Sequence, residues 1–418
     1  MHPKIDSGDT AWLLASAALV MIMTPALGFF YGGLVRRKNV LSTIMHSFFI
    51  LCLISVQWVL WGYSLAFGPD LKGWGVIGDL SWVGLNGVGM NPNPDYGATV
   101  PHLAYMAFQM MFAVITPALI TGAFAERKRF KAFVIFSLLW ATFVYDPVAH
   151  WVWGHGGWLG SKLGALDFAG GTVVHITSGV SALVAAMVLG RRIELQRGEA
   201  HPEEPYDATM TILGASLLWF GWFGFNAGSA ITSGGLAANA WVVTNTATAM
   251  AALTWMTLSW MHRGTPSVLG ATAGAVAGLV AITPASGYVT PPASILIGLG
   301  AGTVCYLCVQ LMKRSGVDDV LDVFAVHGIG GVWGALATGL FATVAINSGA
   351  ANGLFYGNPK QLLIQLIAVA SSFIYAGVMT FVILKVVNVF VPLRVSEHEE
   401  AMGLDVTQHR EVLSPSVS

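Results

Sequence analysis

Charged residues are scarce in this sequence. Of its 418 residues only 10% are Asp, Glu, Lys or Arg, and 55% are hydrophobic, whereas soluble domains carry roughly 25% charged residues. The formal net charge is −1, so no bulk electrostatic attraction to nucleic acid is implied. This composition excludes an ordinary soluble domain and is typical of a membrane protein.

Cysteine is equally rare. Cys52, Cys305 and Cys308 all lie within apolar runs. Cys305 and Cys308 form a C-x-x-C pair on one helical face, but a zinc or redox centre needs a loop or a second pair of ligands. We therefore expect no metal ion and no cofactor.

The beginning of the chain lacks the basic region of a cleavable signal peptide and carries Asp6 and Asp9 instead. The first apolar helix, from Ala11, is therefore expected to remain as a membrane span. In all, eleven apolar segments come close to the roughly 20 residues that cross a bilayer. They are approximately 10–33, 40–66, 101–124, 131–149, 172–190, 208–231, 240–262, 267–285, 292–312, 319–345 and 361–391.

Basic residues are distributed unevenly between the loops that join these segments. Fifteen fall on one set of alternating loops or on the tail, and the opposite set holds only Lys4, Lys72, Lys162 and Lys360. Because Lys and Arg are retained on the cytoplasmic side, this predicts an external N-terminus and an internal C-terminus. We expect an all-α polytopic membrane domain over 1–393 and a cytoplasmic tail over 394–418.

Two spans carry a carboxylate followed by a histidine. Asp167 precedes His175 across a Gly-Gly pair, and Asp322 precedes His327. A lone pair of this kind could be a helix cap and a hydrogen-bonded core histidine. Its recurrence in a second span favours function, because ionisable groups inside a membrane are costly and usually mark a pathway, a relay or a ligand.

The two histidines also hint at an internal repeat. They lie in the fifth and tenth spans, and five helices per repeat would make the second unit, approximately 208–345, inverted relative to the first, approximately 10–190. Inverted repeats usually place the substrate site between them at the bilayer midplane. The remaining helix, 361–391, follows both units. Glycines spaced by four residues, as at Gly274 and Gly278, are expected to serve helix packing.

Five strings, taken together and in this order, resemble the Amt/Rh family of ammonium transporters, on the bacterial Amt side. They are Gly-Phe-Phe-Tyr-Gly-Gly-Leu-Val-Arg-Arg-Lys-Asn-Val-Leu-Ser at 28–42, Gly-Ala-Phe-Ala-Glu-Arg at 122–127, Asp-Phe-Ala-Gly-Gly-Thr-Val-Val-His at 167–175, Trp-Phe-Gly-Phe-Asn-Ala-Gly-Ser at 222–229 and His-Gly-Ile-Gly-Gly at 327–331. The resemblance spans nearly the whole chain. It implies eleven helices, a five-plus-five core, and a homotrimer with one pore per subunit in the cell membrane.

The resemblance also implies roles for individual residues. Phe112 and Phe225 match two phenylalanine gates. Phe112, Trp153 and Ser229 match the outer ammonium site, and Trp222, His175 and His327 match the pore lining. Asp167 matches an acidic residue below the outer site, and we interpret it as structural and electrostatic. Any one of these aromatic residues, taken alone, would be ordinary core packing.

The residue types suit the transport of ammonium. Ring faces can offset part of the desolvation of a cation, and a buried neutral histidine offers one donor and one acceptor nitrogen. The sequence thus predicts ammonium uptake, deprotonation and conduction of ammonia. An ammonium sensor of the same fold is the alternative. No nucleophile–base pair, metal cluster or phosphate loop stands out, so we expect no enzyme.

The tail carries Gly403-Leu404-Asp405-Val406-Thr407-Gln408-His409, which resembles the C-terminal motif of the family. That motif packs under the pore and meets PII-type signalling proteins, so such a partner is implied. The motif usually continues with Gly-Glu and a short Ala-Tyr ending, whereas Arg410-Glu411-Val412-Leu413-Ser414 follows here. A solvated acidic tail, suggested by Glu397, Glu399 and Glu400, is the alternative.

Overall fold

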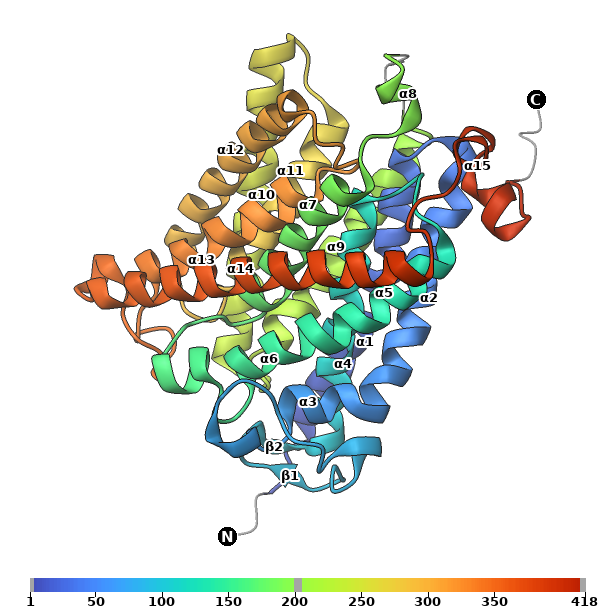
Figure 1. The fold of residues 1–418 in the computed structure, drawn as a ribbon. Coiled ribbons are helices and arrows are strands. Elements are labelled where there is room, and N and C mark those ends of the chain that lie inside the picture. The colour runs from blue at the N-terminus through green and yellow to red at the C-terminus, as the bar shows by residue number, and fades with distance from the viewer. Residues whose placement is uncertain (1–3, 199–204, 414–418) are drawn as a thin grey trace.

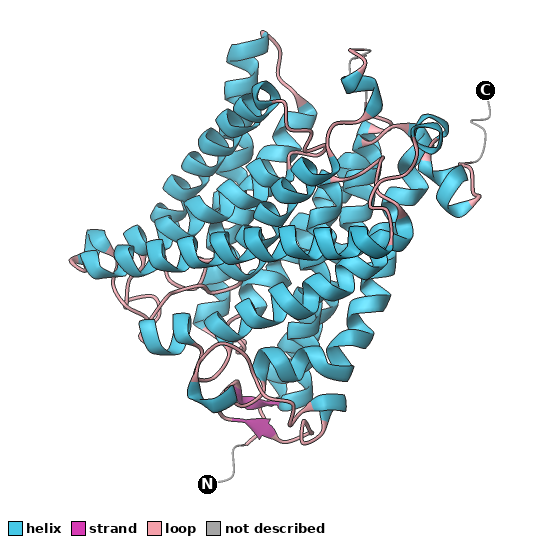
Figure 2. Ribbon diagram, in the orientation of Figure 1, coloured by secondary structure: helices cyan, strands magenta, loops and turns pink. Residues whose placement is uncertain are grey.

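The computed structural model describes residues 4–198 and 205–413, and helices account for most of them (Figure 2). The last residues of the predicted tail, 414–418, lie outside this part. The helices of the first half are α1 Ser7–Leu34, α2 Val40–Gln57, α3 Tyr63–Phe67, α4 His102–Ile120, α5 Phe130–Trp140, α6 Asp146–Trp153, α7 Thr177–Leu189 and α8 Ile193–Gln196. Those that follow are α9 Ala208–Gly228, α10 Gly235–Arg263, α11 Val268–Ile282, α12 Pro291–Ser315, α13 Gly330–Phe341, α14 Pro359–Phe390 and α15 Glu397–Met402.

Every predicted span coincides with helix. Within the described residues, nine helical segments are long and apolar enough to cross a membrane. The segments at α10 and α11 fall outside this set, because α11 has only 15 residues and α10, although long, is less apolar. The chain is therefore a multi-pass, nearly all-helical membrane protein.

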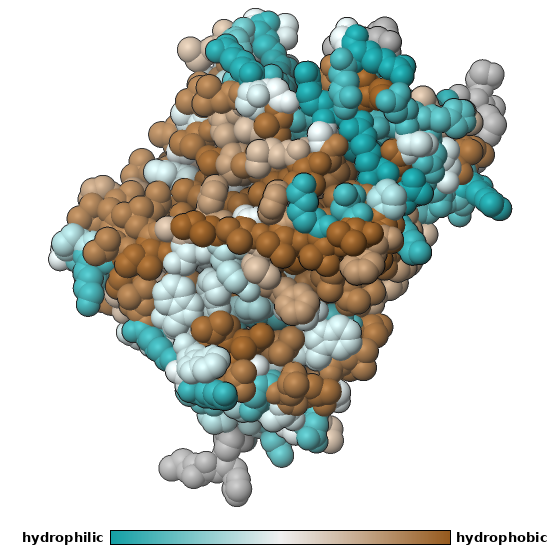
Figure 3. All heavy atoms as spheres, viewed as in Figure 1, coloured by the Kyte–Doolittle hydropathy of each residue, from teal (hydrophilic) through white to brown (hydrophobic). Residues whose placement is uncertain are grey.

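The molecule has two polar ends and an apolar middle. Figure 1 places the start of α1 and the antiparallel hairpin of β1 Pro92–Asn93 and β2 Gly97–Pro101 at one end, and α8 and α15 at the other. Following the orientation predicted from the basic residues, we call these the outer and inner ends. Figure 3 shows hydrophobic residues across the middle of one face, over α14, and hydrophilic residues gathered at the inner end.

Helices that begin the two predicted repeats pack along each other, since α1 and α9 share a long interface. The fifth elements of the two halves also meet, because α7 contacts the π-helical turn Phe324–Ile329. Their backbones come very close there: a Cβ on Gly179 would lie 2.1 Å from the Gly328 nitrogen. Only a residue without a side chain fits at this crossing.

The predicted role of the spaced glycines is confirmed for α11. A Cβ on Gly274 would lie 2.5 Å from the Trp255 Cβ, and one on Gly278 would lie 2.7 Å from the Ala251 Cβ. Both contacts are with α10. Small residues at this spacing let two helix backbones approach closely. In lipid there is no hydrophobic force between helices, so close van der Waals packing of this kind drives their association.

A network of buried ion pairs holds the inner end together. The Glu126 carboxylate accepts hydrogen bonds from the Arg36 backbone N–H at 2.8 Å, from Arg36 Nε at 2.9 Å and from Arg192 Nη1 at 2.9 Å. Arg192 also pairs with Asp318, Nη2 to Oδ1, at 3.0 Å. Glu126 thus ties together the loops that follow α1, α4 and α7.

The tail packs onto this network, so a solvated tail is the wrong interpretation for its central residues. Glu400 is 1% exposed and accepts from the Ile193 backbone N–H at 2.7 Å. The Asp405 carboxylate accepts from the N–H groups of Leu41 at 3.1 Å and Ser42 at 2.7 Å. These are N–H groups of the first turn of α2, which lack intrahelical acceptors. The tail therefore caps a membrane-spanning helix.

Candidate functional site

A cavity of about 260 Å³ opens at the outer end. Its lining includes Phe112, Trp153 and Ser229, which three separate helical segments bring together. The Trp153 indole N–H donates to the Asp167 carbonyl at 2.8 Å, and this bond fixes the ring. The Ser229 hydroxyl donates to the Phe225 carbonyl at 2.8 Å, which leaves its oxygen lone pairs available as acceptors.

Two phenylalanine rings in close contact, tilted by 36°, close the floor of this outer cavity. The ring centroids of Phe112 and Phe225 lie 4.2 Å apart, and Trp153 meets Phe112 edge-on at 5.9 Å. Phe112 lines the outer cavity, and Phe225 lines the space beyond it. The paired rings therefore separate the outer cavity from the interior.

Beyond the rings lies a narrow lumen of about 10 Å³, room for about one water-sized molecule. Its lining is apolar except for His175, His327 and Trp222, and the two histidines are 1% and 3% exposed. His175 stacks on Trp222 with 5.4 Å between ring centroids. The Trp222 indole N–H is bonded to the Thr283 hydroxyl at 2.8 Å, so it does not point into the lumen as a free donor.

The two histidine rings face each other through their Nδ1 atoms at 3.3 Å. One Nδ1 must carry a proton and donate it to the other, because two bare nitrogens would repel. In the neutral pair the donor ring then has a bare Nε2, and the acceptor ring has a protonated Nε2. The His175 Nε2 has no hydrogen-bond partner among the described protein atoms. The pair is thus a short polar chain in an apolar passage.

Asp167 holds the turn that carries His175. Its carboxylate accepts from the N–H groups of Gly170 and Gly171, both at 2.7 Å, and of Thr172 at 2.8 Å. The Thr172 hydroxyl donates to it as well. These donors are the residue that precedes the π-helical turn Gly171–Ile176 and the first two residues of that turn. The carboxylate therefore caps this turn and positions His175 without touching it.

The structural counterpart of Asp167 is Asp319, not Asp322. The Asp319 carboxylate accepts from the Phe324 N–H at 2.7 Å and so caps the π-helical turn Phe324–Ile329, which carries His327. Asp322 is a lining residue of the next cavity. The pairing of Asp322 with His327 inferred from the sequence was wrong in this respect.

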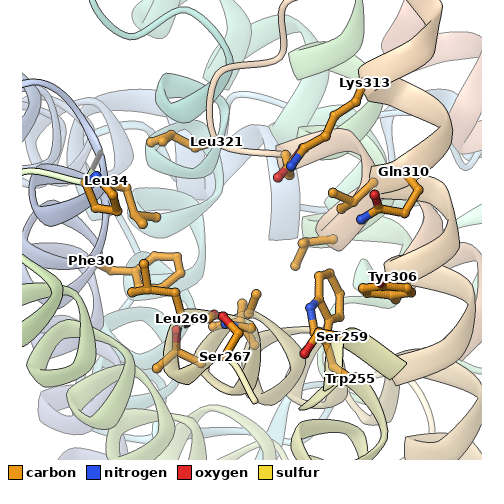
Figure 4. A pocket seen from close by; sticks show the side chains of 18 of the residues that line it. Phe30, Leu34, Trp255, Ser259, Ser267, Leu269, Tyr306, Gln310, Lys313 and Leu321 are labelled. Atoms are coloured by element: carbon orange, nitrogen blue, oxygen red, sulfur yellow. Dashed lines mark hydrogen bonds between the residues drawn. The ribbon is translucent and has the colours of Figure 1, made fainter. Parts of the chain in front are cut away.

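An inner cavity of about 370 Å³ begins at His327 and reaches the inner end. Figure 4 shows Gln310 and Lys313 of α12 on one side of it and Phe30 and Leu34 of α1 on the other. Outer cavity, paired rings, histidine-lined lumen and inner cavity follow one another. They form a single interrupted passage between the two ends of the molecule.

Comparison with known proteins agrees with this arrangement. A profile of the Ammonium Transporter Family matches residues 11–413. An ammonium transporter of Bacillus subtilis is 55% identical over 97% of this chain and 98% of its own length. The chain belongs to the ammonium transporter family. The crystal structure of Saccharomyces cerevisiae Mep2, 36% identical, superposes with a TM-score of 0.89 over 95% of this chain and 89% of that one. A solved Sensor Amt Protein, 28% identical, covers 96% of this chain and 98% of its own with a TM-score of 0.88.

Three polar residues in or beside the passage were not predicted from the sequence. Gln109 is 7% exposed and lines the outer cavity, and its Oε1 has no partner among the described atoms. Asp95 lines the same cavity from the hairpin. Asp319 could have been found, because it precedes His327 by eight residues, as Asp167 precedes His175. Gln109 and Asp95 gave no comparable signal.

Proposed function

We propose that this ammonium transporter family member takes up ammonium at its outer cavity, removes a proton there, and conducts ammonia through the histidine-lined lumen. The observation that supports this most directly is the change in chemistry along the passage. Aromatic faces and oxygen acceptors surround the outer cavity, whereas the lumen beyond Phe112 and Phe225 is apolar and about one small molecule wide. Such a passage favours a cation outside and a neutral molecule inside.

Recruitment rests on Trp153, Phe112 and Ser229, with Gln109 as an additional acceptor. A cation over an aromatic ring gains about 0.5–2 kcal/mol, more where water is excluded. The Ser229 oxygen and the Gln109 Oε1 can each accept an N–H from ammonium. Potassium has a similar size but no N–H donors, so directional acceptors favour ammonium over potassium.

The proton then has to leave before the nitrogen passes the rings. A bare cation in hydrocarbon is opposed by tens of kcal/mol by the Born estimate, whereas neutral ammonia meets little opposition. His175 and His327 share one proton across their Nδ1 atoms, so a proton that reaches one Nε2 can be passed along by exchange of the two tautomers. The histidine pair thereby offers the proton a route of its own, beside the nitrogen.

We infer that Asp167 acts by position and charge. Its oxygens are occupied by backbone N–H groups and the Thr172 hydroxyl, so it is a poor candidate for the base. Asp167 lies beside Trp153, which lines the outer cavity, and a negative charge there favours the arrival of a cation.

The setting that fits this activity is the cell membrane, with the outer end outside and the tail in the cytoplasm. The excess of basic residues at the inner loops supports this orientation. We propose a homotrimer with one passage per subunit, in keeping with the family. A PII-type protein remains a proposed partner of the inner end, where the tail is docked.

Electrophysiology of the purified protein on a supported membrane tests the proposal. Steps of ammonium and of methylammonium should give saturable currents, and equal steps of potassium should give none. A potassium response of similar size and affinity would contradict the assignment of ammonium as substrate.

An ammonium sensor is the second candidate, because the Sensor Amt Protein shares the fold over nearly the whole chain. The same preparation distinguishes the two functions. A sensor that does not transport would bind ammonium, as seen by a shift of its thermal unfolding, while giving no sustained current.

A further inference from the structure

The rim of the outer cavity carries one carboxylate. Among the described residues that line the cavity, Asp95 is the only one with an acidic side chain, and that side chain is 49% exposed. It lies in the turn between β1 and β2, where its backbone N–H donates to Asn93 Oδ1 at 3.0 Å. The carboxylate itself therefore faces the water through which a cation has to arrive.

A histidine lies opposite this carboxylate. His155 Nδ1 is 3.6 Å from Asp95 Oδ1, and the imidazole is 69% exposed. Tyr96 holds the two loops together: its hydroxyl donates to the Phe67 carbonyl at 2.6 Å and accepts from the His155 backbone N–H at 3.0 Å. The fold thus holds the backbone of His155 beside the hairpin that carries Asp95.

Asp70 and Tyr96 also lie beside His155. Asp70, beside Gly156, faces Lys162 Nζ at 3.8 Å and the His150 ring at 3.3 Å, and it accepts from the Gly75 N–H. Burial raises the pKa of Tyr96, which stays neutral. Asp95 and His155 are therefore the pair at the rim that faces water.

We propose that Asp95 recruits the cationic substrate to the outer cavity and that His155 sets how much negative charge it presents. With a neutral imidazole, the carboxylate raises the local concentration of cations at the mouth. With an imidazolium opposite it, the pair is compensated and the attraction is lost. This inference rests on the proposed uptake of ammonium and adds a positioning residue to it, since Asp95 does not touch the rings or the histidine pair.

The substitution Asp95→Asn isolates this charge. The carboxylate makes no hydrogen bond that the fold needs, because its partner is the exposed His155, so folding should be unchanged. Asp79→Asn is the matched control: Asp79 lies in another outer loop and accepts from Ser81 N–H at 2.9 Å through an oxygen that Asn keeps. Asp95→Glu and His155→Gln complete the set.

The measurement is the half-saturating ammonium concentration of the reconstituted full-length protein at about pH 8 and about pH 5.5, between which an imidazole gains its charge. In the wild type we expect the half-saturating concentration to rise roughly two- to five-fold from the higher to the lower pH. This is the effect expected of a single screened charge near the mouth. Asp95→Asn should show the raised value at both pH values. His155→Gln should keep the low value at both, and Asp95→Glu should restore the wild-type pattern. Maximal currents should not change.

Salt provides a second readout that a structural defect would not mimic. The difference between wild type and Asp95→Asn should shrink when ionic strength rises from about 10 mM to about 0.3 M, because screening shortens the range of the carboxylate. Equal half-saturation in wild type and Asp95→Asn at low salt and high pH would overturn the inference. So would an equal effect of Asp79→Asn. A wild type without any saturable ammonium current would refute the proposed function itself, which is a different result.

Discussion

Replacing Glu126 by Gln is the sharpest test of how the inner end is held together. Burial by itself raises the pKa of Glu126, but the guanidinium groups of Arg192 and Arg36 outweigh it and lower the pKa from 4.5 to about 2. At about 1.4 kcal/mol per pKa unit, this shift corresponds to about 3 kcal/mol of stability at neutral pH. Breaking a buried ion pair from one side costs about 3–5 kcal/mol, which agrees.

The pH dependence follows from the same shift. A carboxylate with a lowered pKa contributes its full stability above the ordinary value of 4.5, and this is lost as pH falls toward 2. Over this pH window the free energy of unfolding of the wild type should therefore fall by about 3 kcal/mol relative to that of Glu126→Gln. The free energy of unfolding in detergent, measured for both proteins at several pH values, gives the difference directly.

Glu397→Gln is the control. Glu397 pairs with Arg197 at 3.1 Å, but its side chain is 72% exposed, so removal of its charge should have no measurable effect on stability. If Glu126→Gln unfolds within about 0.5 kcal/mol of the wild type at neutral pH, or if the two proteins lose stability in parallel on acidification, the ion-pair account of the inner end is refuted.

Three further predictions concern the passage and the tail. His175→Ala and His327→Ala should each lower the proton-coupled current about 100-fold or more, and the double mutant should be little worse, because the pair acts as one unit; an unchanged current in the double mutant would place the relay elsewhere. Gly179→Ala should destabilise the protein by about 1–3 kcal/mol by overpacking, whereas Gly377→Ala, whose nearest neighbour would be 3.4 Å away, should not; equal thermal unfolding of the two variants would argue against the close crossing. Asp405→Ala should speed hydrogen exchange of the tail and of the first turn of α2 while leaving the spans protected, and unaltered exchange would mean that the tail is not a cap.

The spans were predictable because the bilayer imposes a length and a composition on each of them. The strings at 28–42, 167–175 and 327–331 indicated the family and, through it, the aromatic and histidine residues that the structure brings together. The resemblance implied that Phe112 and Phe225 are gates. Their contact, with ring centroids 4.2 Å apart, corresponds to no local pattern in the sequence.

Other features depend on contacts between distant segments and left no local pattern. In the hairpin at 92–101, turn residues occupy positions where a strand would show alternating polar and apolar residues. The π-helical turns shift the register of the histidines along their helices. Hydropathy does not reveal a change from i→i+4 to i→i+5 hydrogen bonds. The burial of Asp405 needs the free N–H groups of Leu41 and Ser42, more than 360 positions earlier in the chain.

The contacts of the inner end join residues that the ribosome adds to the chain at widely separated times. Arg36 precedes Glu126 by 90 positions, and Arg192 precedes Asp318 by 126. The hydrogen bond from the Ile193 backbone N–H to Glu400 spans 207 positions. While the ribosome is still at work, the early loops therefore present guanidinium groups without carboxylates, and uncompensated positive charge is what retains a loop on the cytoplasmic side. Synthesis of residues 400–405 later adds the Glu400 and Asp405 carboxylates to the same loops. The same side chains can thus orient the chain during insertion and lock it afterwards.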